Sequence, residues 1–226
     1  MGNQWSPLIR YSQPGQREAL PVTSTLSGQR KMGEDVMRIT AVAILVLCLV
    51  HESFGADFKN YEAPGNLESK NDLECVESEK LSNRYTPADL YKAISKCVNQ
   101  DKYKEGAFMF ALAGVYGRFD SFRVADNTAH QAIAVLRMQT FSSLGKEKEN
   151  AFKESLKNTL GNPDGLASIC KEIRSLGTPD YYPRYMVQHG MGAFQKNNSG
   201  NGLVADFDSK AAWEKSLDTY LHCPKQ

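Results

Sequence analysis

The chain has 226 residues, 41% of them hydrophobic and 23% charged, as is usual for a folded globular protein. Its formal net charge is +1 at pH 7, whereas proteins that bind nucleic acid or anionic membrane surfaces carry a marked basic excess. The composition therefore predicts no nucleic-acid partner and no adhesion to a charged membrane surface.

A signal for export is predicted at residues 37–56. Arg38 gives a short positive region, the stretch from Ile39 to Val50 is an apolar run, and Ser53 and Gly55 supply the small residues of a cleavage site. This order is typical of a secretory signal peptide. As a helix the apolar run would extend about 18 Å, too short for a hydrocarbon core of about 30 Å. We therefore expect a cleaved signal, no membrane span after cleavage, and a periplasmic or secreted protein.

Residues 1–36 precede this signal and contain Gln, Ser, Pro and Gly without apolar periodicity, which predicts a disordered extension. Because a signal peptide is recognised at the amino terminus, Met37 is the expected start of translation. The chain that remains after cleavage is long enough for one domain.

Four cysteines follow the predicted signal peptide. An even number in an oxidising compartment predicts two disulfides, for which four cysteines allow three pairings. Pairing of sequence neighbours favours Cys75–Cys97 and Cys170–Cys223, and the first of these would stabilise the fold by about 3 kcal/mol through loop closure. No two cysteines have the C-x2-C spacing of a zinc ligand pair, so we expect no thiolate metal site.

A polar leader is expected before the domain. Residues 57–84 are polar and acidic, which predicts a surface segment held at Cys75, and residues 85–226 are expected to form the helical domain. Thr86 and Pro87 begin its first helix as N-cap and first-turn proline. The apolar face of this helix is formed by Leu90, Ile94, Cys97 and Val98.

A second helix carries an apolar stripe with a row of small residues beside it: Phe108, Leu112, Val115 and Phe119, then Ala107, Ala111 and Gly114. These small positions resemble one tetratricopeptide-type hairpin when they are taken with four residues of the first helix, Tyr91, Ile94, Ser95 and Val98. The resemblance implies a groove that binds a peptide. An ordinary antiparallel helical hairpin is the other interpretation of the same residues.

Five more segments show helical periodicity or helix signals. They cover residues 123–144, 146–165, 165–179, 179–194 and 208–224. In the last of them, Asp208 or Ser209 is the expected cap, and the expected core residues are Trp213, Leu217 and Leu221. Because strand-like alternation is nearly absent, the chain is predicted to be an all-α, single compact domain of about six or seven helices.

The stretch "PDYYPRYMVQHGMGAF" at residues 179–194 is the most unusual of these segments. Pro179 and Pro183 predict a helix start, because proline is tolerated in the first turn. The predicted helix places one set of residues near a single face, namely Tyr185, Met186, His189 and Phe194. Gly190 or Gly192 is the expected end of the helix.

Three histidines remain after cleavage, His130, His189 and His222, and each lies in a different predicted helix. If they converged, they could bind zinc and leave one position open, which defines an alternative function as an envelope metal-dependent enzyme. No spacing such as H-x-x-x-H preassembles a site, and the chain lacks a G-x-S-x-G nucleophile elbow. We predict no catalytic residue, no metal and no cofactor.

Two stretches concentrate residue types that are common in protein interfaces. The candidate binding surface consists of Tyr181, Tyr182, Arg184, Tyr185, Arg118 and Arg123. For the tyrosines, the alternative is core packing with hydroxyls on polar partners. For the two arginines of the second stretch, which alternate with Asp120 and Asp126, the alternative is a structural network of ion pairs.

Export, size, helix content and paired cysteines together resemble the small, disulfide-stapled, all-helical exported proteins of bacteria. One class of these consists of immunity proteins, which neutralise toxins delivered into the periplasm. The resemblance implies a protein that binds another protein and has no catalytic activity of its own. A tetratricopeptide-like scaffold for a peptide and the metal-dependent enzyme are the alternatives.

Overall fold

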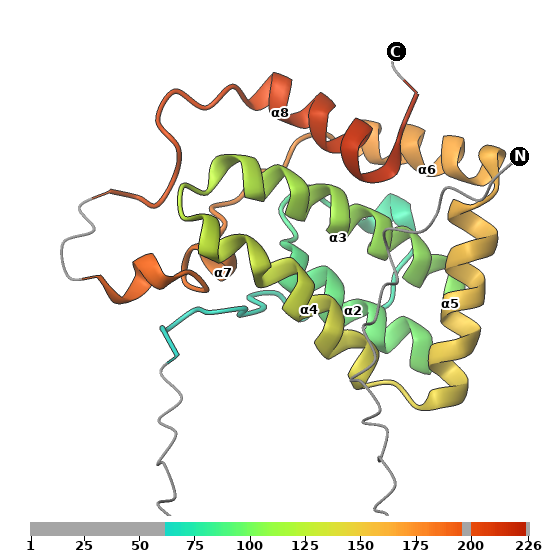
Figure 1. Ribbon diagram of the computed structural model, residues 1–226. Helices are drawn as coiled ribbons and strands as arrows, with labels where there is room; N and C mark the ends of the chain where they lie inside the picture. Colours follow the sequence, from blue (N-terminus) through green and yellow to red (C-terminus); the bar gives the residue numbers. More distant parts are fainter. Residues whose placement is uncertain (1–61, 196–199, 225–226) are drawn as a thin grey trace, which may run out of the picture. The chain divides into compact units, whose positions relative to one another are not determined.

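The computed structural model describes residues 62–195 and 200–224 (Figure 1). The predicted extension, the predicted signal peptide and Met37 lie outside the described residues. Within the described ranges there are seven α-helices and no strand, which confirms an all-α fold of six or seven helices. These helices are α2 (Pro87–Asn99), α3 (Tyr103–Arg123), α4 (Ala132–Ser142), α5 (Lys146–Leu160), α6 (Pro163–Leu176), α7 (Arg184–Val187) and α8 (Ser209–Ser216).

Four short helical segments accompany them. They are η1 (Ser78–Lys80), η2 (Asn127–Gln131), η3 (Met191–Phe194) and η4 (Leu217–Leu221), the last a π-helical continuation of α8. Among the helices described, none is long and apolar enough to cross a membrane.

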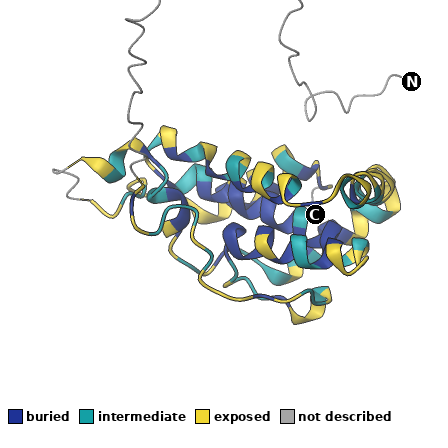
Figure 2. Ribbon diagram, turned by 90° about the horizontal axis from the view of Figure 1, so that it is seen from below, coloured by how far each residue is buried: buried dark blue, intermediate teal, exposed yellow. Residues whose placement is uncertain are grey.

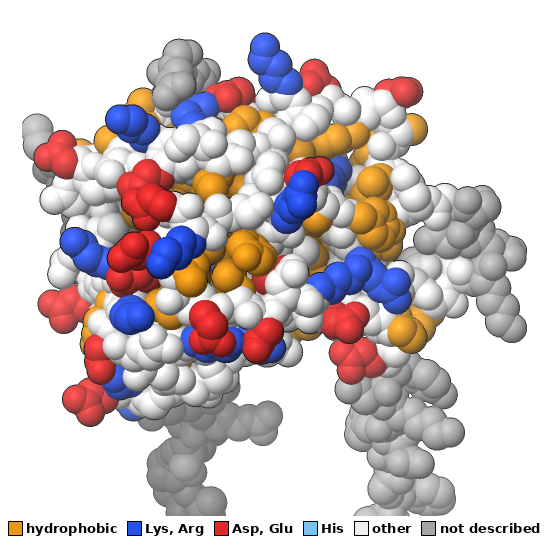
Figure 3. Space-filling view, turned by 180° about the vertical axis from the view of Figure 1, so that it is seen from behind, with side chains coloured by type: hydrophobic (Ala, Val, Ile, Leu, Met, Phe, Trp, Pro, Cys, Tyr) orange, Lys and Arg blue, Asp and Glu red, His pale blue; other side chains and the backbone are white. Residues whose placement is uncertain are grey.

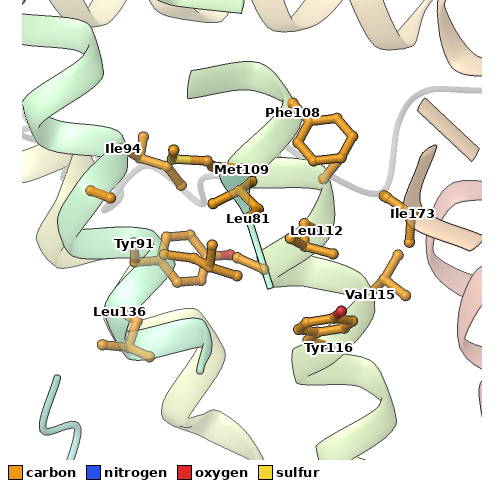
Figure 4. Packing of buried hydrophobic residues seen from close by; sticks show 14 of the residues in the cluster. Leu81, Tyr91, Ile94, Phe108, Met109, Leu112, Val115, Tyr116, Leu136 and Ile173 are labelled. Carbon is orange, nitrogen blue, oxygen red and sulfur yellow. The ribbon is translucent and has the colours of Figure 1, made fainter. Parts of the chain in front are cut away.

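Helix α3 lies at the centre of the domain (Figure 1). Its residues from Gly106 to Asp120 are buried, with the exception of Phe110 and Arg118. A helix that is apolar on nearly every side must be covered on nearly every side, and α2, α5, α6 and α8 pack around α3. Figure 2 shows buried residues along the inner helices and exposed residues along the outer ones. In the close view of Figure 4, side chains of α2 and α3 point toward one another, among them Ile94 and Met109.

The N-terminus of α2 is fixed by a capping box. The sequence predicts its N-cap Thr86 and the first-turn Pro87. The Asp89 amide donates to Thr86 Oγ1 at 3.2 Å, and the Thr86 amide donates to Asp89 Oδ2 at 2.9 Å. The other carboxylate oxygen of Asp89 accepts hydrogen bonds from the amides of Lys70 and Asn71 at 2.8 and 2.9 Å. The cap of α2 therefore also holds the preceding leader.

The leader is more than a surface segment. Ala63, Leu73 and Leu81 are buried, and the last two belong to the main hydrophobic core. Few apolar residues occur in this part of the sequence, so apolar periodicity did not indicate that these three residues are buried. The expectation of a leader that only runs over the surface is therefore wrong for its described part.

Both predicted disulfides are confirmed. Cys75 is bonded to Cys97, which joins the leader to α2, and Cys170 is bonded to Cys223, which joins α6 to the chain after η4. Each disulfide therefore fastens a terminal part of the domain to a helix that packs against α3.

The small residues of α3 do not line an open groove. Ala107 and Ala111 are fully buried, and Gly114 lies so close to Tyr220 of η4 that a Cβ atom there would overlap the tyrosine ring. The row of small residues therefore lets the C-terminal segment approach α3 closely. A groove of the tetratricopeptide kind is not open at these positions.

Candidate interaction site

The unusual stretch at residues 179–194 folds differently from the single helix that was predicted. Helix α7 contains only the four residues Arg184–Val187, with Pro183 before it, and Gln188 ends it. Gly190 has an extended backbone and begins the separate segment η3, which contains Phe194. The prediction that Phe194 shares a helical face with Tyr185 is therefore wrong, as is the prediction that Gly190 or Gly192 caps the helix.

Two tyrosines of this stretch point into the domain. The hydroxyls of Tyr181 and Tyr185 donate to Asp120 Oδ2 at 3.0 and 2.7 Å. Tyr185 is 2% exposed and Asp120 is completely buried. Tyr185 is thus a core residue, and its assignment to a binding surface is wrong, because its hydroxyl has a buried acceptor on α3.

Arg123 completes this buried polar cluster. Its Nε donates to Asp120 Oδ1 at 2.8 Å, and its Nη2 lies 2.7 Å from the same oxygen as an ion pair. The Nη2–Oδ1 contact lacks hydrogen-bond geometry, so the buried Nη2 has no hydrogen-bond partner among the described residues. The guanidinium also lies over the rings of Phe119 and Tyr181, 5.1 and 5.0 Å from their centroids. Arg123 is therefore a structural residue, and its assignment to an exposed surface is also wrong.

Burial dominates the electrostatics of the cluster. It raises the pKa of Asp120, and the charge of Arg123 together with the hydrogen bonds from Tyr185, Arg123 and Tyr181 offsets part of this rise. Burial also raises the pKa of Tyr181 and of Tyr185 well above the ordinary tyrosine value, and the nearby Asp120 carboxylate adds to the effect. Both tyrosines are therefore held in the protonated form, in which they donate to Asp120.

Tyr182 and Arg184 point the other way, and we call them the outer pair. Tyr182 is 46% exposed, and its hydroxyl donates to the backbone oxygen of Asn201 at 2.6 Å. Arg184 is also exposed, and its Nη2 donates to the backbone oxygen of Pro64 at 3.2 Å. Gly65 lies beneath the Arg184 side chain with a φ of 95°, a conformation that favours glycine. Both side chains are therefore exposed but fixed in position.

Large exposed apolar side chains gather in the same part of the chain. Five such residues occur in the described ranges, and four of them lie between residues 182 and 204: Tyr182, Met191, Phe194 and Val204. Segment 123–128 connects the parts of this region, because the Val204 amide donates to the Arg123 oxygen and the Met191 amide donates to Thr128 Oγ1, both at 2.8 Å. In Figure 1, α7 and η3 lie at one end of the domain, away from α5 and α6.

The face opposite to the view of Figure 1 is chemically mixed. Figure 3 shows hydrophobic side chains that reach this surface in several places, separated by basic and acidic side chains.

At the edge of the stretch at residues 179–194, Arg84 Nε lies 3.7 Å from Asp180 Oδ2, and both side chains are largely exposed. An exposed pair of this kind contributes little to stability.

Arg118 does not belong to this region. Residues two positions apart on a helix point about 200° apart, so Arg118 faces away from the buried Asp120. Its Nε donates to Thr219 Oγ1 of η4 at 3.3 Å. Asp126 caps η2 by accepting from the Thr128 amide. The four alternating charges thus form one ion pair, Asp120 with Arg123, and not a single network.

The three histidines have separate roles. His130 Nε2 lies 2.9 Å from the Val124 oxygen, and His189 Nδ1 lies 2.8 Å from Asn66 Oδ1. His222 is exposed and follows η4 in the left-handed conformation. No group of three His, Cys, Asp or Glu residues in the described ranges could hold a metal ion. The set of histidines required by the metal-enzyme alternative is therefore not assembled.

A shallow pocket lies elsewhere, between the leader, α2 and α4. It has a volume of about 250 Å³ and includes the hydroxyl residues Ser69, Ser95 and Ser143 in its lining. Ser95 and Ser143 are hydrogen-bonded to each other at 3.1 Å. The pocket does not include the outer pair or the tyrosine cluster.

Comparisons of the chain with protein-family models, with curated proteins and with solved structures found no match. The functional interpretation therefore depends on the chemistry of the molecule itself. Asp120, which organises the tyrosine cluster, was not among the predicted site residues. Its position in the apolar sequence "GVYGRFDSF" was the available signal, because a carboxylate in a buried helix requires partners.

Proposed function

We propose that this protein is an exported helical protein that acts by binding another protein, and that the outer pair of Tyr182 and Arg184 is the centre of its binding surface. The observation that carries the proposal is the alternation along residues 181–185. Tyr181 and Tyr185 are held inside by Asp120, so Tyr182 and Arg184 are held outside, in the same part of the chain as three other exposed apolar side chains.

The chemistry of the outer pair suits protein recognition. Tyrosine and arginine are enriched among the residues that dominate binding free energy in interfaces. Both side chains are already fixed by hydrogen bonds to the backbone, to Asn201 and Pro64. Binding would therefore cost less side-chain entropy than it would with mobile side chains.

Two further observations support the setting of this function. All four cysteines of the described ranges are in disulfides, and disulfides persist in the oxidising environment of the periplasm or the extracellular medium. The predicted signal peptide agrees with this location. Among exported helical proteins, the immunity-type role is the narrower proposal, in which the partner is a toxin that reaches the periplasm.

The test begins with photo-crosslinking from position 182 in the source cell envelope. The captured protein is then purified, and its affinity is measured by calorimetry for the wild-type chain and for a Tyr182→Ala/Arg184→Ala variant. We expect the double variant to weaken binding by about 1,000-fold, since interface hot spots contribute about 2 kcal/mol or more each.

The matched control is Met138→Ala, which removes another large exposed side chain, 56% exposed on α4. It should leave the affinity unchanged. Equal affinity of the wild-type protein and the double variant, with both folded, would contradict the proposed surface.

A further inference from the structure

A second surface lies where α3 meets α8, and its central residue is Phe122. Arg118 Cζ lies 4.6 Å from the centroid of the Phe122 ring, and Lys215 Nζ lies 4.6 Å from the same centroid. The two cationic groups are therefore at most about twice that distance apart. We call Arg118, Phe122 and Lys215 the cation pair site.

The core of the domain fixes this arrangement. Trp213 of α8 packs against the rings of Tyr116 and Phe119 on α3, with centroids 6.1 and 6.3 Å apart. Leu217 is fully buried one turn further along. These two anchors hold α8 and η4 against α3 by packing that does not involve charge, and the exposed Lys215 reaches the Phe122 ring from α8. Arg118 is held by its hydrogen bond to Thr219.

Neither cation has a carboxylate partner in the described part of the chain. Some other basic side chains are paired with carboxylates: Lys96, for example, lies 2.9 Å from Asp72 and 2.6 Å from Glu74. Arg118 and Lys215 form no ion pair with any described residue, although Asp218 lies only three positions after Lys215. Two like charges thus share one aromatic ring without a counter-charge. Cation–π attraction to Phe122 holds each of them there, but it does not neutralise them.

We propose that the cation pair site binds a carboxylate of an acidic protein segment, with Arg118 and Lys215 on the acid and Phe122 against the neighbouring apolar side chain. Arginine matches the planar geometry of a carboxylate, and lysine adds a point charge. Nucleic acid would require a longer basic stripe, and the chain has a formal net charge of only +1. The site shares no contact with the outer pair, because Arg118 bonds Thr219 of η4, whereas Tyr182 and Arg184 bond Asn201 and Pro64.

The test uses the full chain labelled with ¹⁵N and a short glutamate-rich peptide as the probe. We expect amide resonances of Arg118, Phe122, Lys215 and Thr219 to shift on titration. The apparent affinity should fall at high salt, because exposed charges are screened. An Arg118→Gln/Lys215→Gln variant should weaken peptide binding by about tenfold or more.

The matched control is Lys102→Gln/Lys104→Gln, which removes two exposed cations at the other end of α3 and changes the net charge by the same amount. It should leave peptide binding at the site unchanged. Shifts that centre on Lys102 and Lys104, or no shifts at all, would overturn the proposal.

Two further probes decide the class of partner. They are a single-stranded oligonucleotide and vesicles of phosphatidylglycerol and phosphatidylcholine. If either probe shifts the same resonances when the peptide does not, the assignment to an acidic protein is overturned. A Tyr182→Ala/Arg184→Ala variant should bind the peptide like the wild type. Failure of the outer pair as a binding surface would therefore be distinguishable from failure of the cation pair site.

Discussion

Four residues within 181–185, three tyrosines and one arginine, divide into an inner half and an outer half with opposite roles. The inner half, Tyr181 and Tyr185, donates both hydroxyls to the buried Asp120. The outer half, Tyr182 and Arg184, makes its hydrogen bonds to backbone oxygens at the surface. The same side-chain chemistry therefore stabilises the fold on one side and is available to a partner on the other. What separates the two roles is the position of one carboxylate on α3.

The largest expected effect comes from removing that carboxylate. Asp120→Ala leaves the buried guanidinium of Arg123 without its ion-pair partner and two tyrosine hydroxyls without an acceptor. Breaking a buried ion pair from one side costs about 3–5 kcal/mol, so the free energy of unfolding should fall by about that amount. Urea denaturation measures it.

The control for this substitution is Asp180→Ala, which removes an exposed carboxylate beside Arg84. It should change the free energy of unfolding by less than about 1 kcal/mol. A similar small loss for Asp120→Ala would mean that the cluster contributes little to stability.

A smaller effect is expected when a single hydroxyl is removed from the inner half. Tyr185→Phe keeps the ring in the core but deletes the 2.7 Å hydrogen bond to Asp120. The free energy of unfolding should fall by about 1.5 kcal/mol, as is usual for a hydrogen bond to a charged acceptor. Tyr103→Phe is the matched control, because its hydroxyl bonds the exposed Asp101, and it should be nearly neutral.

The sequence predicted the helices well because their signals are local. Thr86 and Pro87 begin α2, Asp208 caps α8, and the segments predicted as helical at residues 123–144, 146–165 and 165–179 correspond to α4, α5 and α6. The cysteine pairing followed from spacing. The helix signals depend on neighbours within a few residues, and the cysteine pairing required a choice among only three alternatives.

The candidate site could be predicted only in part. Tyr181 and Tyr185 lie 61 and 65 residues after Asp120, and no periodicity links them across that distance. The direction of each side chain depends on α7 being a single turn after Pro183, which the prediction of one helix within residues 179–194 could not show. Tertiary contact with α3 therefore decided which of the predicted surface residues are buried.

The inner half can also be distinguished by its response to pH. Burial raises the pKa of Asp120 in the folded state, so the folded protein binds this proton more tightly than the unfolded chain. The contribution of Asp120 to stability is then greatest below its ordinary pKa and is lost as pH rises through the folded pKa. Asp120→Asn should remove this pH dependence. The measurement is the free energy of unfolding of the wild type minus that of the variant, compared between acid and neutral pH.

Asp89 should show the opposite sign. Burial raises its pKa, but the hydrogen bonds from Asn71 and Thr86 outweigh burial and lower it. Its contribution is therefore present above the ordinary pKa and is lost as pH falls through the folded pKa. Asp89→Asn and Asp120→Asn should tilt the pH profile of stability in opposite directions, and equal tilts would contradict the assignment of the two carboxylates.

The smallest effect on stability is expected from the outer pair. Tyr182→Ala and Arg184→Ala remove exposed side chains whose partners are backbone oxygens that water can reach, so each should change the free energy of unfolding by about 0.5 kcal/mol or less. Tyr185→Ala, the same substitution on the inner side, should cost about 3–5 kcal/mol as a buried aromatic residue. Thermal denaturation of the three variants compares them directly. A large loss for Tyr182→Ala would show that its bond to the Asn201 oxygen holds the 200–204 segment in place, and the outer pair would then be as structural as the inner one.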